Sequence, residues 1–193
     1  MSATTNIRVY ANQQLVNWLR IMPASTDERR TLELLKNHGE FKATLILLSM
    51  KGDLPLLESY VHAVARRWFE LAKEHYADAS NTNSRTSPRA VYSRAYYAVY
   101  NASKSVRYIA RGQVSLKGDD HRKVADLPDN FPNVDSWAAK LQILYEHRLR
   151  ADYDNCSGTT TENMLSAAQC VEDAGDFLEI AAQFLQSEYG FNT

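Results

Sequence analysis

The residues of this chain best suited to chemistry lie in residues 147–154, where an arginine interrupts an apolar helical pattern. Leu141 and Leu144 are followed at a helical step by Arg148, so the three side chains are expected on one helix face. Removing a guanidinium group from water costs several kcal/mol unless an opposite charge meets it. Arg148 therefore needs a counter-charge, which could be Asp152 one turn later, a phosphate group or a partner chain.

The overall charge limits what the whole molecule can bind. The sequence has 22 Lys and Arg against 23 Asp and Glu, so it is no polycation that coats nucleic acid or anionic membranes. Residues 85–151 are locally basic, with twelve Lys and Arg against six Asp and Glu. This local excess of basic residues indicates either a surface for a phosphate-bearing partner or an ordinary solvated helix face. The candidate RNA-binding residues are Arg94, Arg107, Arg111 and Arg150.

Metal-binding and targeting signals are missing from the sequence. The five histidines form no i, i+4 pair, and the two cysteines, Cys156 and Cys170, belong to no CxxC motif. We therefore expect no metal site, no disulfide framework and no cofactor. Because no signal-peptide pattern is present and no apolar run approaches the ~20 residues of a membrane span, we expect a cytoplasmic protein without a membrane partner.

Helical periodicity dominates the chain after residue 53 and predicts an all-α protein, an antiparallel four-helix up-and-down bundle. The second helix is the best delimited, because Ser87 and Pro88 suit its start and Gly112 suits its end. Turn-forming residues then place His121 on a connection between helices. The four helices are expected at about residues 56–76, 88–111, 134–153 and, after a capping box at 159–162, up to about Tyr189.

The first fifty residues are harder to assign. Pro23 should stop one short helix, and a capping box at residues 25–28 should open another that Gly39 ends. Residues 40–50 suit either a buried helix turn or a strand, and their helical neighbours favour helix. We therefore divide the chain into an N-terminal helical extension, residues 1–53, and a helical bundle, residues 54–193.

Two motifs and one histidine give the chain a family resemblance. The pattern S-x-A-Y-Y-A occurs at residues 93–98, His121 follows in a loop, and R-x-x-A-D-Y occurs at residues 148–153. In this order they resemble the HEPN superfamily, in its small prokaryotic branch, over about residues 56–189. The resemblance implies a helical bundle that forms a homodimer, here through the second and third helices, within a toxin–antitoxin pair or an antiviral defence system. An unrelated four-helix protein with tyrosine-rich packing is the alternative.

The resemblance also implies a possible reaction. Many HEPN proteins are metal-independent ribonucleases whose signature is Arg, four to six residues, then His, with Arg binding phosphate and His taking a 2′-hydroxyl proton. Arg148 matches the arginine, but Tyr153 stands where His is expected, and tyrosine, with a pKa near ~10, is a poor base. His121 or His147 could replace the base, unless each is simply solvent-facing. The candidate catalytic residues are Arg148, Asp152, Tyr153, His147 and His121.

Three functions remain open from the sequence. The protein could bind RNA, a nucleotide or an antitoxin or defence-complex partner at a dimeric site around Arg148. It could be a metal-independent ribonuclease toxin that cleaves single-stranded RNA, with Arg150 and Asp152 organising the site. It could also be a purely structural dimer in which Arg148 and Asp152 only clamp helices.

Overall fold

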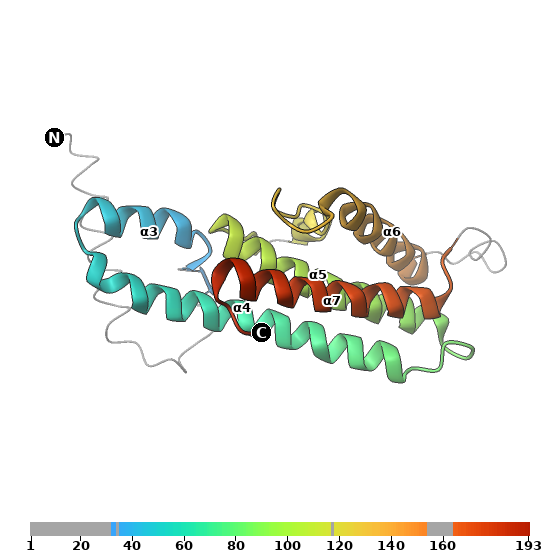
Figure 1. The fold of residues 1–193 in the computed structure, drawn as a ribbon. Helices are drawn as coiled ribbons and strands as arrows, with labels where there is room; N and C mark the ends of the chain where they lie inside the picture. The colour runs from blue at the N-terminus through green and yellow to red at the C-terminus, as the bar shows by residue number, and fades with distance from the viewer. Residues whose placement is uncertain (1–31, 34, 117, 154–163) are drawn as a thin grey trace.

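The computed structural model describes residues 32–33, 35–116, 118–153 and 164–193, and this part of the chain contains helices and no strand. Consecutive long helices run in alternating directions (Figure 1). The all-α class is therefore confirmed. The α-helices are α3 (His38–Leu47), α4 (Leu54–Asn81), α5 (Pro88–Arg111), α6 (Val134–Tyr153) and α7 (Ala167–Tyr189), joined by the 3₁₀ helices η1 (Lys51–Asp53) and η2 (Gly118–Lys123).

The ends of α5 and α6 lie where the sequence predicts them. Pro88 occupies the first turn of α5, and Gly112 ends this helix in the left-handed conformation, with φ of 70°. The side chain of Ser87, expected as the N-cap of α5, makes no capping hydrogen bond. α4 extends beyond its predicted range at both ends.

α7 begins later than the sequence predicts. Its N-cap is Ser166, whose hydroxyl accepts a 3.1 Å hydrogen bond from the Gln169 amide. Leu165, expected within the helix, precedes it, because its amide donates to the imidazole of His147 and its carbonyl accepts from the hydroxyl of Tyr92. The predicted capping box at residues 159–162 lies outside the described residues.

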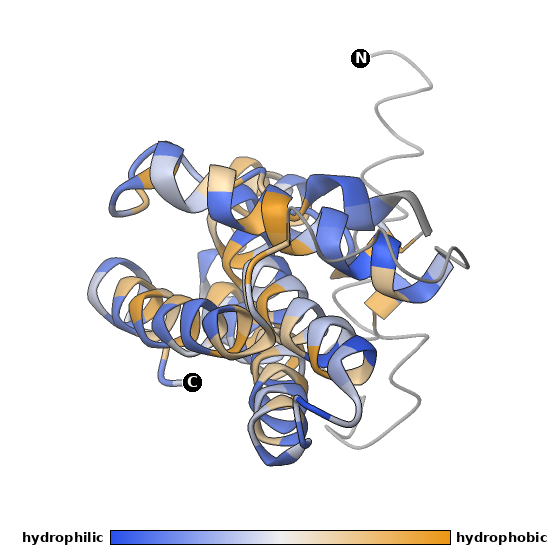
Figure 2. Ribbon diagram, turned by 90° about the vertical axis from the view of Figure 1, so that its right-hand side faces the viewer, coloured by the Kyte–Doolittle hydropathy of each residue, from blue (hydrophilic) through white to orange (hydrophobic). Residues whose placement is uncertain are grey.

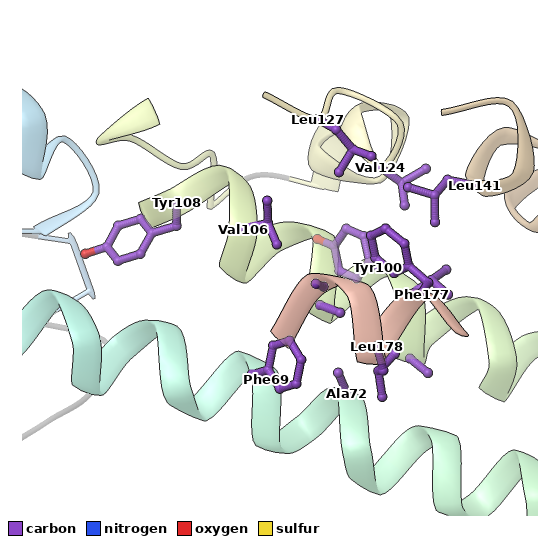
Figure 3. Close-up of a cluster of buried hydrophobic side chains, with 14 of the residues drawn as sticks. Phe69, Ala72, Tyr100, Val106, Tyr108, Val124, Leu127, Leu141, Phe177 and Leu178 are labelled. Atoms are coloured by element: carbon purple, nitrogen blue, oxygen red, sulfur yellow. The ribbon is translucent and has the colours of Figure 1, made fainter. Parts of the chain in front are cut away.

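α5 is the central element of the bundle. α4, α6 and α7 all pack on it, and α6 makes little contact with α7, so the four helices are not spread evenly around one axis. Figure 3 shows Phe69 and Ala72 of α4 on one side of α5, and Leu141 of α6 with Val124 on the other. The apolar sides of the helices face one another, and their polar sides face outward (Figure 2). Three alanines of α5 are fully buried, which allows this close approach: Ala95, Ala98 and Ala102.

This arrangement bears on the expected dimer contact. A homodimer was expected to form through the second and third helices, α5 and α6. Most of α5 is buried by its own chain, and only Arg89, Ala90, Arg94 and Arg111 are exposed along it. Its apolar stripe therefore serves the core of the protomer, and α5 has little surface left for a second copy.

The described part of the N-terminal extension packs against the C-terminal end of α5. α3 confirms the helical interpretation of residues 40–50 as far as Leu47, but Gly39 lies in its first turn and ends no helix. The Gly39 amide donates a 2.8 Å hydrogen bond to the Gly112 carbonyl, and the imidazole Nε2 of His38 lies 2.9 Å from the Tyr108 carbonyl. Two glycines meet here because their backbones approach too closely for a side chain.

Gly112→Ala should destabilise the fold by at least about 1–2 kcal/mol, because an L-residue is strained in the left-handed conformation. The new Cβ would also lie 2.7 Å from the Cα of Gly39. Gly52→Ala is the control, since a Cβ at Gly52 would meet nothing within 4 Å. Urea denaturation of both variants measures the difference, and equal midpoints would contradict the packing at Gly112.

Candidate functional site

Arg148 lies near the C-terminal end of α6, where the stripe of Leu141 and Leu144 ends. Its side chain is only 12% exposed, and its Nε lies 2.8 Å from Oδ2 of Asp152, one turn later on the same helix. The Nε–H is not aligned well enough for a hydrogen bond, so the two groups interact as an ion pair. Nη2 donates a 3.0 Å hydrogen bond to the hydroxyl of Tyr97 on α5. Arg148 is therefore hydrogen-bonded to α5 through Tyr97, whereas its ion pair with Asp152 lies within α6.

Aromatic rings surround the guanidinium group of Arg148. Its Cζ lies 5.9 Å from the ring centroid of Tyr96, 5.6 Å from that of Tyr97 and 5.3 Å from that of Tyr153. These distances fall within the range of cation–π attraction. Tyr96 is fully buried, whereas the side chain of Tyr153 is 68% exposed. The guanidinium group of Arg148 thus lies between the buried ring of Tyr96 and the exposed ring of Tyr153.

His121, in η2, contacts two of the same rings, those of Tyr96 and Tyr97. Its ring centroid lies 5.8 Å from that of Tyr96, 5.9 Å from that of Tyr97 and 4.2 Å from that of Tyr100, on which it stacks. Burial and, after it, the positive charge of Arg148 lower the pKa of His121. The structure thus places His121 beside Arg148, although 27 residues separate them in the sequence.

The residue before His121 fixes the position of η2. The carboxylate of Asp120 is fully buried and accepts two 3.1 Å hydrogen bonds from Arg107 and one of 3.0 Å from the hydroxyl of Tyr100. The ammonium group of Lys104 lies 3.5 Å away. Burial alone would raise the pKa of Asp120, but its hydrogen bonds with Arg107 and the charge of that residue hold it below its usual range. This buried ion cluster of α5 and η2 was not predicted from the sequence.

His147 is not solvent-facing, and it does not join Arg148. It is 5% exposed, and its Nε2 accepts a 2.8 Å hydrogen bond from the amide of Leu165. Its ring packs edge-on against Tyr92. The candidate base His147 is therefore engaged in holding the start of α7 against α6. Adjacent helix positions point about 100° apart, which explains why His147 and Arg148 have different partners.

Two of the candidate RNA-binding arginines are engaged elsewhere. Arg107 is 4% exposed, and both Nη atoms donate to Asp120, so it has no free face for RNA and is removed from the candidate site. Arg111 binds Asp126 through two 2.7 Å hydrogen bonds. It also lies 14 residues after Tyr97 on α5, about 21 Å along the helix axis.

The other two arginines lie closer to Arg148. Arg94 is half exposed, lies 3.7 Å from Asp78 and donates from Nη1 to Nδ1 of His75 at 3.1 Å. The ring of His75 lies 5.4 Å from that of Tyr97, so Arg94 borders the same aromatic cluster. Arg150 is exposed on α6, two residues after Arg148. A step of two residues on an α-helix turns the side chain by about 200°, so Arg150 points away from Arg148. Arg94 is therefore the basic neighbour that a ligand at Arg148 could reach.

Comparison with known proteins identifies the family. A family model described as HEPN domain matches residues 65–186, which is more than half of the chain. The match includes the Arg148 cluster, which consists of Arg148, Asp152, Tyr153, Tyr96, Tyr97 and His121. The chain belongs to the HEPN family. No curated protein and no solved structure matches it. HEPN membership indicates a nucleotide- or RNA-related role in defence or toxin systems.

Arg148 was expected to match the arginine of the HEPN signature, and the sequence has tyrosine at the expected position of its histidine. Tyr153, at that position, lies at the end of α6 with its ring against Arg148. His121 shares two aromatic neighbours with Arg148, Tyr96 and Tyr97, whereas His75 shares only Tyr97. Sequence spacing to Arg148 gave no sign of this, because η2 brings His121 in from the preceding connection.

Neither a metal centre nor a membrane span is found in the described residues. No three His, Cys, Asp or Glu side chains of that part of the chain gather in a way that could hold a metal ion. Among its helices, none combines the length and apolarity needed to cross a bilayer.

Proposed function

We propose that this HEPN protein binds single-stranded RNA at a site around Arg148 and acts without strong cleavage in a toxin–antitoxin or antiviral defence system. The observation that carries the proposal is the environment of Arg148. Tyr97 and Asp152 hold its Nη2 and Nε, while Nη1 makes no hydrogen bond within the described chain. A guanidinium group fixed in this way has donors left for a phosphate group.

The tyrosines favour a single-stranded ligand. Proteins that bind single strands combine cationic side chains with aromatic faces on which bases stack. Tyr153 offers an exposed ring next to Arg148, and Arg94 adds positive charge beside Tyr97. Three other tyrosines of α5 are buried and leave the stacking of bases to Tyr153: Tyr92, Tyr96 and Tyr100.

We further propose that the site works in a homodimer, as the family implies, with α6 as the contact. Ile143 of α6 is 39% exposed although it is apolar, and Tyr153 is exposed at the end of the same helix. A second copy packed along α6 would bring two Arg148 side chains to one RNA strand. Light scattering should then give about twice the 21.9 kDa of one chain.

A metal-independent ribonuclease is the second candidate, and the position of His121 favours it. In such a reaction a histidine takes the 2′-hydroxyl proton, the 2′-oxygen attacks phosphorus, and the bond to the 5′-oxygen breaks as that oxygen takes a proton from water. The products are a 2′,3′-cyclic phosphate and a 5′-hydroxyl end. His121 can accept that proton only if a ring nitrogen that faces the RNA is unprotonated and makes no other hydrogen bond.

The test mixes the purified protein with a fluorescently labelled single-stranded RNA in EDTA. We expect the fluorescence anisotropy to rise with protein concentration, and a denaturing gel to show intact RNA after binding. Robust EDTA-resistant cleavage with cyclic phosphate ends would replace binding by the ribonuclease function. An unchanged anisotropy with intact RNA would leave only a structural role for the Arg148 cluster.

A further inference from the structure

The hydrogen bond between His121 and Tyr96 determines what His121 can do. Nδ1 of the imidazole lies 2.9 Å from the hydroxyl oxygen of Tyr96. Tyr96 is fully buried, and its hydroxyl has no other hydrogen-bond partner within the described chain. A buried hydroxyl proton without an acceptor costs about 1–3 kcal/mol, so the Tyr96 hydroxyl donates to Nδ1.

This donation fixes the tautomer of the ring. A neutral imidazole has one nitrogen that accepts and one that carries the proton. Burial and the neighbouring Arg148 charge lower the pKa of His121, so the ring is neutral at pH 7. With Nδ1 accepting from Tyr96, the proton is on Nε2, and Nε2 makes no hydrogen bond within the described chain.

His75, on the other side of Tyr97, has the same tautomer for an independent reason. Its Nδ1 lies 3.1 Å from Nη1 of Arg94, and a guanidinium group can only donate. Nδ1 of His75 therefore accepts, and its proton is on Nε2. Burial lowers the pKa of His75 as well, so this ring is also neutral at pH 7.

We propose that Tyr96 is a positioning residue that holds His121 in the Nε2–H tautomer, so that His121 donates a hydrogen bond to a phosphate oxygen of the RNA and is not a general base. Arg148 and His121 would then bind one phosphate group from two elements, α6 and η2. The part of this inference that concerns RNA rests on the proposed function. The tautomer itself is a property of the free protein.

The tautomer is measured on ¹⁵N-labelled protein by NMR correlation of the imidazole carbon-bound protons with the ring nitrogens, with His121→Ala assigning the signals. At neutral pH we expect a protonated Nε2 and an unprotonated Nδ1. Tyr96→Phe should abolish this preference, because it removes the donor. Tyr145→Phe should preserve it, because that ring contacts Tyr96 without a hydrogen bond to His121. A protonated Nδ1 in the wild type would overturn the proposal, whether or not RNA binds.

Binding measurements with phosphate and RNA test whether Nε2–H of His121 donates to the ligand. The amide nitrogen of glutamine can replace Nε2–H as a donor but cannot act as a base. His121→Ala should therefore weaken binding of inorganic phosphate and of RNA about ten-fold, and His121→Gln should restore most of the loss. Equal losses in both variants, with the Nε2–H tautomer present, would show that His121 does not contact the phosphate group.

Discussion

Replacing Asp120 with alanine is expected to destabilise the fold by about 3–5 kcal/mol, because it leaves buried cations without their counter-charge. The side chains of Arg107 and Lys104 are 5% and 12% exposed, and both face the fully buried carboxylate of Asp120. The hydroxyl of Tyr100 would lose its acceptor as well. Urea denaturation monitored by circular dichroism measures the change in the free energy of unfolding.

Asp126→Ala is the matched control for this prediction. Asp126 accepts two hydrogen bonds from Arg111, just as Asp120 does from Arg107, but the side chains of Asp126 and Arg111 are 47% and 36% exposed. Solvent screens such a pair, so its loss should cost at most about 1 kcal/mol. Equal costs for the two alanine variants would contradict the view that burial makes the Asp120 cluster critical.

The Asp120 contribution should also depend on pH. Because its pKa in the folded protein lies below the usual value, the ionised carboxylate stabilises the fold above the ordinary aspartate pKa of about 3.9. This stabilisation is lost as the pH falls through the folded-state pKa. The difference in stability between wild type and Asp120→Asn should therefore be constant near neutral pH and narrow only in acid below about pH 3.9.

The helix ends that carry local signals were predictable from the sequence. Pro88 and Gly112 bracket α5, and an apolar stripe delimits α6, so both helices were placed correctly. The start of α7 was not, because the backbone of Leu165 is bound by His147 and Tyr92. Such long-range hydrogen bonds leave no periodic trace in the sequence.

The site was predictable only in part. The spacing of α6 placed Arg148 beside Asp152 and at the end of a buried stripe. Arg107 was expected to bind RNA because a sequence shows which residues are charged but not which are buried. Its partner Asp120 is 13 residues away, in the connection after α5. The same connection brings His121 to Arg148, whereas the geometry of α6 turns the neighbouring His147 away from it.

Arg148→Ala is expected to weaken binding of single-stranded RNA about ten- to a hundred-fold, because a hydrogen bond to a charged group contributes about 1.5–3 kcal/mol. The fold should survive, since Asp152 and the hydroxyl of Tyr97 can turn to solvent once the guanidinium group is removed. Lys51→Ala is the charge-matched control. Lys51 is exposed in η1, at the end of α4 remote from Arg148 (Figure 1).

The most direct measurement is fluorescence anisotropy of a labelled single-stranded RNA, in EDTA, over a series of salt concentrations for wild type, Arg148→Ala and Lys51→Ala. We expect Arg148→Ala to lose the stated affinity and to reduce the slope of log affinity against log salt by about 0.7, as for one lost phosphate contact. Lys51→Ala should match the wild type in both quantities. Wild-type affinity and slope in Arg148→Ala would contradict RNA binding at this site.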